Sequence, residues 1–179
     1  MLRGRGILVL CKGLQETWVL RQCVVNSVIR GGVHKKGSLE LADIIRSTRE
    51  NLDFHKAGAI GIFIGVVRGE IGEGIVEKLE LEAHEEDADA VLEGICSSLS
   101  QEKGIIDVQI HHLLGEFESG EELVYVLVAG EHRNDVFPVL QKAVKRFKKE
   151  VPVFKKEYVS RKDGKTISYW IGEKKVPSS

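Results

Sequence analysis

The spacing of apolar residues changes repeatedly along this chain, and each change predicts a new structural element. Alternating or continuous apolar runs are typical of strands. They occupy six segments: 58–69, 75–84, 105–117, 123–132, 151–160 and 166–173. Apolar residues three and four positions apart are typical of helices. They occupy three segments: 38–51, 85–104 and 134–151. This order predicts a two-layer α+β domain with a largely antiparallel sheet.

The first two strands differ in their expected burial. Segment 58–69 is a continuous apolar run interrupted by glycines, which predicts a buried strand. Segment 75–84 alternates, with Ile75 and Leu79 on one face and Val76 on the other, which predicts a half-exposed strand.

Residues at the segment boundaries predict where helices and turns lie. We expect Gly104 to close the second helix and Asn134 to cap the third, which ends before Pro152. The sequence EIGEGI, residues 70–75, predicts a turn or a mobile loop. The sequence RKDGK, residues 161–165, predicts the turn of a hairpin.

The length of 179 residues suits one domain with a small appendage. We expect the domain at 38–174, an N-terminal extension of unknown role at 1–37 and a disordered tail at 175–179. The stretch TWVLRQCVVNSVI in the extension could form a strand, but it has no domain-sized core. No apolar run approaches the roughly 20 residues of a membrane span, and the apolar core near Met1 is too short for a signal peptide. We therefore expect a cytoplasmic protein that binds no membrane.

Positive charge is concentrated in two parts of a nearly neutral chain. The net charge is −1, which gives the whole molecule no general affinity for nucleic acid. Residues 1–37 nevertheless carry seven basic residues and one acidic residue, and residues 142–165 carry ten basic and three acidic residues. A local basic site on an otherwise acidic molecule predicts an anionic ligand at one place.

The cysteines and histidines predict no metal site. Cys11, Cys23 and Cys96 match no zinc or redox motif, so we expect reduced thiols that are mostly buried. His111 and His112 are adjacent in a strand and face opposite ways, which makes them a poor metal pair. We expect one of the two in the core and the other at the surface.

Two candidate sites lie where strands end. Arg68 ends an apolar strand, which places its charge at the rim of the sheet; a solvated loop arginine is the alternative. His132 and Arg133 lie between a strand and a helix, where unpaired backbone N–H groups and the helix dipole favour an anion. The alternative is that Asn134 or Asp135 caps the helix and His132 is a surface residue.

The stretch KRFKKEVPVFKKE, residues 145–157, is a third candidate site. Lysines in a last helical turn favour the negative end of the helix dipole, which suffices to explain Lys145 and Lys149. Lys155 differs, because strict alternation in the next strand turns it to the same face as Val153. An inward lysine needs a partner or a ligand, and a lowered pKa would suit it to acid, base or nucleophilic chemistry.

These three candidate sites, in this order, carry a resemblance to a known family. From about Glu40 to Lys174 the chain resembles the large, catalytic subunit of molybdopterin synthase. The matching segments are GAIGIFIGVVRG, LELEAH, HHLLGEFESGEELVYVLVAGEHR and FKKEVPVFKKE. The last is the most specific, because the family has a lysine late in the helix, then a proline, then a second lysine after an aromatic residue.

The resemblance implies both a fold and an activity. The fold is an α/β hammerhead with an additional antiparallel β subdomain. The activity is the insertion of two sulfurs into cyclic pyranopterin monophosphate, which forms molybdopterin. The sulfur comes from a thiocarboxylate on the C-terminal glycine of a ubiquitin-like small subunit, and the large subunit is a homodimer within a heterotetramer. The resemblance implies no cofactor and no metal, and no cysteine is needed because the sulfur arrives on the partner.

The family's functional residues fall on seven positions of this chain. The catalytic lysines fall on Lys148 and Lys155. The substrate-binding residues fall on Phe63, Arg68, His132, Arg133 and Lys174. Lys174 stands where the family brings a basic residue, usually arginine, from the other protomer into the site.

Two rival functions remain open at this point. A scaffold could bind the ubiquitin-like protein without chemistry, but a scaffold would need neither Lys148 nor Lys155. A nucleic-acid-binding domain could use the basic patch at 142–165, but that would predict several exposed aromatic residues between the lysines.

Overall fold

The computed structural model describes residues 30–161 and 165–171. Its strands are β1 (Gly31–Lys35), β2 (Ala59–Val66), β3 (Glu70–Ile71), β4 (Gly74–Ala83), β5 (Ile105–Phe117), β6 (Glu122–Gly130), β7 (Val153–Ser160) and β8 (Thr166–Ile171). Its helices are α1 (Leu41–Arg49), α2 (Glu85–Leu99) and α3 (Arg133–Glu150), with a 3₁₀ turn at Phe54–Lys56.

All eight strands join one sheet, in which the path runs β2-β6-β5-β4-β7-β8. Every pairing is antiparallel except that of β1 with β5, and β3 pairs only with β4. The long strand β5 connects two parts of the sheet, because β4 pairs with it only where Leu79–Leu81 meets Gly115–Phe117. The α+β fold with a largely antiparallel sheet is therefore confirmed.

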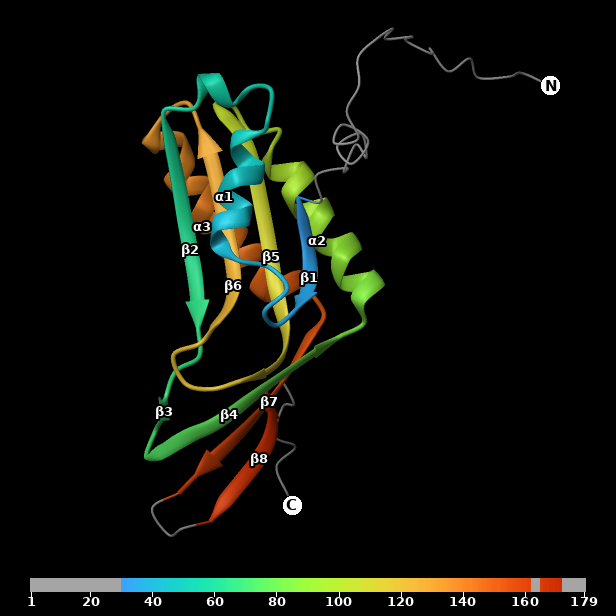
Figure 1. Ribbon diagram of the computed structural model, residues 1–179, viewed down its shortest axis with the longest axis vertical. Helices are drawn as coiled ribbons and strands as arrows, with labels where there is room; N and C mark the ends of the chain where they lie inside the picture. Colours follow the sequence, from blue (N-terminus) through green and yellow to red (C-terminus); the bar gives the residue numbers. More distant parts are fainter. Residues whose placement is uncertain (1–29, 162–164, 172–179) are drawn as a thin grey trace, which may run out of the picture.

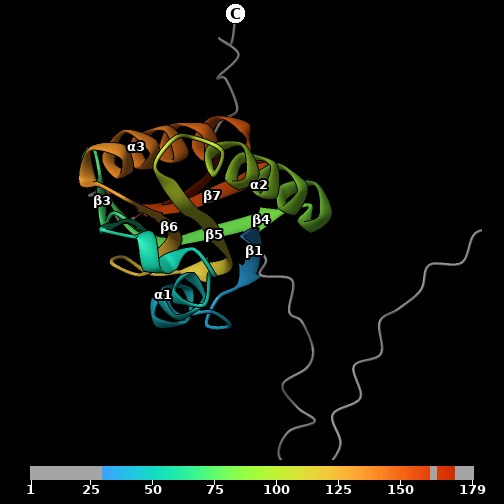
Figure 2. The same ribbon diagram turned by 90° about the horizontal axis from the view of Figure 1, so that it is seen from above.

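The helices cover the two faces of one part of the sheet unequally. Viewed from above, α2 and α3 lie on one face and α1 lies on the other (Figure 2). The strands β3, β4, β7 and β8 extend beyond the helices at the lower end of the molecule (Figure 1). The C-terminal end of α3 consequently meets the β7–β8 hairpin at the junction between the two parts.

Apolar residues at helical spacing form the core between the helices and the sheet. The residues of α2 that are buried are Ala88, Leu92, Ile95, Cys96 and Leu99, and those of α3 are Val136, Val139, Ala143 and Phe147. All of these except Ala88 pack with the central strands β5 and β6 in one continuous cluster. The predicted apolar faces of both helices are confirmed.

Strand β2 is not the buried strand that its apolar run predicts. It is the last strand of the sheet path, and α3 covers only one of its faces. Ile60, Ile62 and Val66 are exposed on the other face, Val66 by 51%. Gly61 allows α3 to pack closely, because a Cβ there would lie 2.8 Å from the side chain of Val136.

An irregularity in β4 reverses the predicted alternation at its start. The register against β7 shifts between Val76 and Lys78, so that Val76 and Leu79 are both buried although three positions apart. Ile75 is 59% exposed as a result. One extra residue in a strand moves every preceding side chain to the opposite face. The predicted loop before β4 is a short hairpin, in which β3 pairs with Gly74 and Ile75.

The helix boundaries correct two predictions and confirm a third. Helix α2 ends at Leu99, and Gly104, at a φ of +76°, lies in the connection that follows. His132, rather than Asn134, is the N-cap of α3, without a capping hydrogen bond from its side chain. The helix ends at Glu150, before Pro152, as predicted.

Strand β1 lies within the predicted extension at 1–37 and belongs to the sheet. It pairs in parallel with the middle of β5. Gly31 permits this position, because a Cβ there would lie 2.9 Å from the backbone of Leu92 in α2. The rest of the extension up to residue 29, and the predicted tail, lie outside the described residues.

His111 and His112 are both buried, with exposures of 4% and 2%, so the prediction that one is at the surface is wrong. The reason is that β5 is a central strand with both faces covered. His111 shares a hydrogen bond of 3.0 Å with His34 and one of 3.2 Å with Gln109. His112 lies on the other face, where its ring meets the ring of Phe147 edge-on.

The two buried histidines predict acid sensitivity. Burial lowers the pKa of His111 and of His112 to about 4, from the ordinary 6.5. The unfolded chain therefore binds more protons, so stability is complete above about pH 6.5 and falls toward pH 4, by up to about 1.4 kcal/mol per pH unit for each histidine. Burial raises the pKa of Asp107, so at this carboxyl the folded chain binds a proton more readily than the unfolded chain. Asp107 therefore offsets part of the stability lost at low pH.

Urea unfolding between pH 7.5 and 4.5 measures this loss. His84→Asn is the control, because it removes an exposed histidine instead of a buried one. An unfolding free energy that stays constant over this range would contradict the burial of these histidines as neutral groups.

Candidate active site

A cavity of about 720 Å³ opens where the two parts of the sheet meet. The end of β2 and the residues after it, the last turn of α3, and the facing sides of β7 and β8 line it. Apolar residues form most of the wall, and Arg68, Lys148 and Lys155 bring three cationic groups to it. The cavity is therefore suited to an anionic ligand that also has an apolar face.

Lys148 reaches the cavity from the last turn of α3. The preceding residue, Phe147, is buried in the core and fixes the orientation of this turn. The Nζ atom of Lys148 lies 5.5 Å from the centroid of the Phe63 ring on β2, a cation–π contact. This contact places an exposed ammonium group beside an aromatic wall of the cavity.

Lys155 faces the cavity from β7, as strict alternation predicts. Its neighbour Lys156 points to the opposite face, over the rings of Tyr158 and Trp170 at 5.1 and 5.6 Å. Burial is the main cause that lowers the pKa of Lys155, the positive charge of Lys148 lowers it further, and Glu157 opposes both. A lysine with a lowered pKa can give up and recover a proton more easily than an exposed one.

Arg68 follows β2 on a segment that hydrogen bonds hold in place. Val67 is buried, its N–H donates to the carbonyl of Glu121, and its carbonyl accepts from the N–H of Gly120. Gly69 lies so close to Ser119 that a Cβ would come within 2.5 Å of the hydroxyl. The anchored backbone carries the exposed Arg68 side chain to the rim of the cavity, as predicted.

His132 and Arg133 do not lie at this cavity. They are exposed at the N-terminal end of α3, whereas Lys148 lies in its last turn. Fifteen residues of continuous helix separate Arg133 from Lys148, which corresponds to about 22 Å. The structure thus brings together Phe63, Arg68, Lys148 and Lys155, and it keeps His132 and Arg133 apart from them. Lys174 lies outside the described residues.

Sequence reasoning missed Glu157, the one carboxylate among the described residues that line the cavity. The signal was present, because Glu157 follows Lys155 by two positions in a strand and so shares its face. The hydroxyl of Tyr169 on β8 donates a hydrogen bond of 2.7 Å to the Glu157 carboxylate.

The described cysteine is unsuited to nucleophilic chemistry. Cys96 is fully buried in α2, and its thiol donates to the carbonyl of Arg30 at 3.2 Å. Burial raises the pKa of this thiol to about 12, which keeps it protonated at neutral pH. Cys11 and Cys23 lie outside the described residues.

Within the described ranges, no three histidine, cysteine or acidic side chains gather as metal ligands would. No helix in this part of the chain combines the length and the apolar character that crossing a membrane requires.

Comparison with known proteins identifies the family to which this fold belongs. Residues 34–150 match the family described as MoaE protein. The molybdopterin synthase catalytic subunit of Pyrococcus abyssi is 37% identical over 121 residues, which cover 67% of this chain and 78% of that protein. A probable molybdopterin synthase of Haloferax volcanii is 32% identical over 120 residues, 66% of this chain but only 44% of that protein's length.

A solved structure gives the same result. The crystal structure of molybdopterin synthase from Staphylococcus aureus superposes with a TM-score of 0.66 at 26% identity, covering 79% of this chain and 96% of that one. The family match and the fold therefore define a MoaE-like domain. The chain belongs to the MoaE family of molybdopterin synthase catalytic subunits, which are enzymes of molybdenum cofactor biosynthesis.

Proposed function

We propose that this chain inserts two sulfur atoms into cyclic pyranopterin monophosphate, forming molybdopterin. The sulfur donor is a thiocarboxylate at the C-terminal glycine of a ubiquitin-like small subunit. The observation that carries the proposal is the convergence of Lys148 and Lys155, from two different elements, on one cavity beside Arg68. The family's catalytic lysines match these two positions.

The charges of the reactants explain why three cationic groups meet here. The substrate carries a cyclic phosphate and the donor ends in a charged thiocarboxylate, so the two repel each other as they approach. Cationic groups fixed in a partly dry cavity cancel this repulsion and stabilise negative charge that develops during the reaction. The ring of Phe63 supplies an apolar wall against which the flat pterin can lie.

The two lysines differ in environment and so in their proposed roles. Lys148 is exposed and beside the ring of Phe63, where it can contact the incoming thiocarboxylate and the reacting carbon. It stabilises the anionic addition intermediate or transfers a proton to it. Lys155 assists from β7, where its lowered pKa suits it to proton transfer.

His132 and Arg133 complete the site from a second copy of the chain. Since about 22 Å of helix separates Arg133 from Lys148, one chain cannot place both on one substrate. In a symmetric homodimer, the N-terminal end of α3 of one protomer can lie at the cavity of the other, where it would bind the phosphate. Lys174 of the second protomer is assigned to the same role, and two small subunits complete a heterotetramer.

We also assign the fold to the α/β hammerhead class with an additional antiparallel subdomain. The extension of β3, β4, β7 and β8 beyond the helices supports this assignment. The cytoplasmic location and the absence of a required cofactor remain predictions.

Reconstitution tests the proposal. The protein, a thiocarboxylated small subunit and cyclic pyranopterin monophosphate are incubated together, and molybdopterin is measured. Formation of molybdopterin would support the proposed sulfur-transfer activity. A stable complex with the small subunit that yields no product would favour the alternative, a non-catalytic scaffold that binds a sulfur carrier.

Cys96→Ser tests whether the reaction needs a cysteine of this chain. We expect full sulfur transfer, because the thiol is buried and protonated, with a loss of stability of about 1 kcal/mol from placing a hydroxyl in an apolar site. Thermal unfolding and product formation are measured side by side. Loss of sulfur transfer in a variant that remains folded would show that the proposed chemistry is wrong.

A further inference from the structure

A carboxylate at an anion-binding cavity needs an explanation. Glu157 lies two positions after Lys155 on the same face of β7, and both side chains line the cavity. A free carboxylate there repels the anionic substrate. It can also pair with the Lys155 ammonium and so compete with the substrate for it, at the high effective concentration of an attached group.

The structure shows Glu157 held away from such a pair. Tyr169 lies directly opposite Glu157 in the β7–β8 pairing, and its hydroxyl donates to the Glu157 Oε2 atom at 2.7 Å. Lys155 and Glu157, both within the described ranges, do not approach within ion-pair distance. The carboxylate is thus turned toward the edge strand β8.

We propose that Tyr169 is a positioning residue, whose hydroxyl restrains Glu157 so that the carboxylate stays near Lys155 without pairing with it. Lys155 then remains open to the anionic substrate. This inference rests on the proposed function for its substrate, a pterin phosphate, but the arrangement of the three side chains does not depend on it.

Several other charged or titratable groups lie around Lys155 and also influence its charge. Lys148 faces it from α3, Arg68 shares the cavity with it from the segment after β2, and His112 lies in the core on β5. Besides burial, the positive charge of Lys148 opposes a charged Lys155, whereas Glu157 supports it. At a distance, Glu157 therefore stabilises the charged form of Lys155. In direct contact, it would compete with the anionic substrate for the Lys155 ammonium.

Tyr169→Phe removes the restraint while it keeps the ring. The freed Glu157 is expected to pair with Lys155, so the KM for the pterin phosphate rises about 2- to 5-fold, the range of a partly exposed ion pair. Tyr158→Phe is the matched control. The Tyr158 side chain lies on the opposite face of β7, where its hydroxyl donates a hydrogen bond of 2.8 Å to Glu80 of β4. Loss of this hydroxyl should not change KM.

A double-mutant cycle separates restraint from simple loss of a contact. In the Glu157→Gln background no carboxylate is left to restrain, so adding Tyr169→Phe should change KM no further. An equal rise in KM in both backgrounds would overturn the proposal, as would an unchanged KM in Tyr169→Phe alone.

The pKa of Lys155 can be measured without turnover, so it tests the restraint of Glu157 by Tyr169 independently of the proposed function. The pKa of Lys155 is followed by NMR in protein with ¹³C-labelled lysine. It should rise in Tyr169→Phe, because the carboxylate closes on the ammonium, and fall in Glu157→Gln. If the natural protein made no molybdopterin, these opposite shifts would still support the restraint. An unchanged pKa in Tyr169→Phe would contradict it, whatever the activity.

Discussion

Two variants that are each inactive, Lys148→Ala and Arg133→Ala, are expected to restore sulfur transfer when they are mixed as subunits of one dimer. In the proposed function both residues serve the same substrate, and because Arg133 lies about 22 Å from Lys148 along α3, they can do so only from different chains. A mixed dimer then has one site with both mutations and one site with neither. An unfractionated random mixture should recover about a quarter of the natural activity, and isolated mixed dimers about half.

The control for this experiment pairs Lys148→Ala with Lys155→Ala. Both lysines line the same cavity of one chain, so every site of a mixed dimer lacks one of them and the mixture stays inactive. Mixed dimers are isolated with two different affinity tags before the assay. If verified mixed dimers of Lys148→Ala and Arg133→Ala stayed inactive, the proposed position of Arg133 in the partner's site would be wrong.

Lys148→Ala by itself is expected to reduce kcat/KM for sulfur transfer by about 10²- to 10³-fold or more, the usual effect of removing a group that stabilises charge in the transition state. The fold should be unaffected, because Lys148 is exposed and its only described contact is the cation–π contact with Phe63. Lys155→Ala should also be strongly impaired, with a smaller loss if Lys155 only assists.

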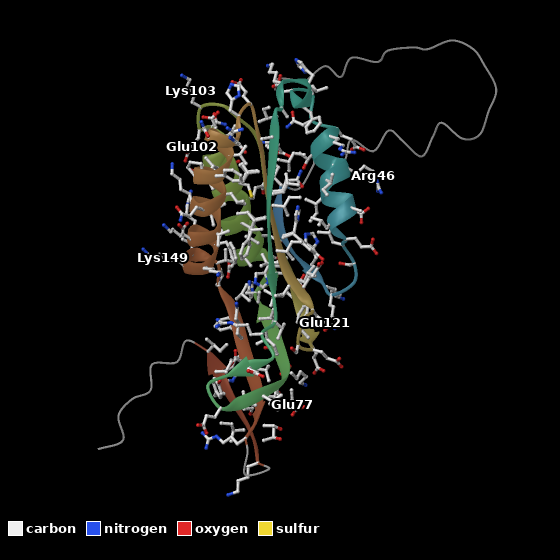
Figure 3. All side chains as sticks on the ribbon, turned by 90° about the vertical axis from the view of Figure 1, so that its left-hand side faces the viewer. Arg46, Glu77, Glu102, Lys103, Glu121 and Lys149 are labelled. Atoms are coloured by element: carbon white, nitrogen blue, oxygen red, sulfur yellow. The ribbon has the colours of Figure 1, made fainter. Side chains whose placement is uncertain are left out.

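Lys149→Ala is the matched control. Lys149 is the next residue of α3, is equally exposed, and points away from the sheet (Figure 3). It contributes the same charge to the protein but none to the cavity, so its loss should leave kcat/KM within about 2-fold. A comparable loss of activity in Lys149→Ala would mean that the general charge of this corner matters more than the position of Lys148.

Alternation predicted the position of Lys155 correctly from the sequence. A strand turns every second side chain to the same face, and β7 remains regular from Val153 onward. The same rule failed at the start of β4, where the register shifts between Val76 and Lys78. Such a shift depends on pairing with a distant strand, which local periodicity does not contain.

The burial of His112 and the exposed face of β2 show a second limit. Both strands are apolar runs in the sequence, yet β5 is covered on two faces and β2 on one. The difference comes from their places in the sheet order, which pairing of distant segments decides. From the sequence alone we predicted a buried strand at the edge strand β2 and a surface histidine on the central strand β5, and both predictions are wrong.

The candidate site was predictable where its residues lie close together in one chain. Phe63, Arg68, Lys148 and Lys155 meet at the cavity as the resemblance implied. The separation of Arg133 from them follows only from the length of α3, which runs unbroken although Pro138 lies within it. The resemblance predicts a functional role for these residues but does not indicate whether His132 and Arg133 act in their own chain or in a second copy.

The most direct test of the central claim is the mass of the small subunit during a single turnover. The natural protein is mixed with cyclic pyranopterin monophosphate and an excess of thiocarboxylated small subunit. We expect two thiocarboxylates to become ordinary carboxylates for each molybdopterin formed, and none in Lys148→Ala. Loss of the thiocarboxylate without the pterin, or molybdopterin formed equally well by Lys148→Ala, would contradict sulfur transfer at this cavity.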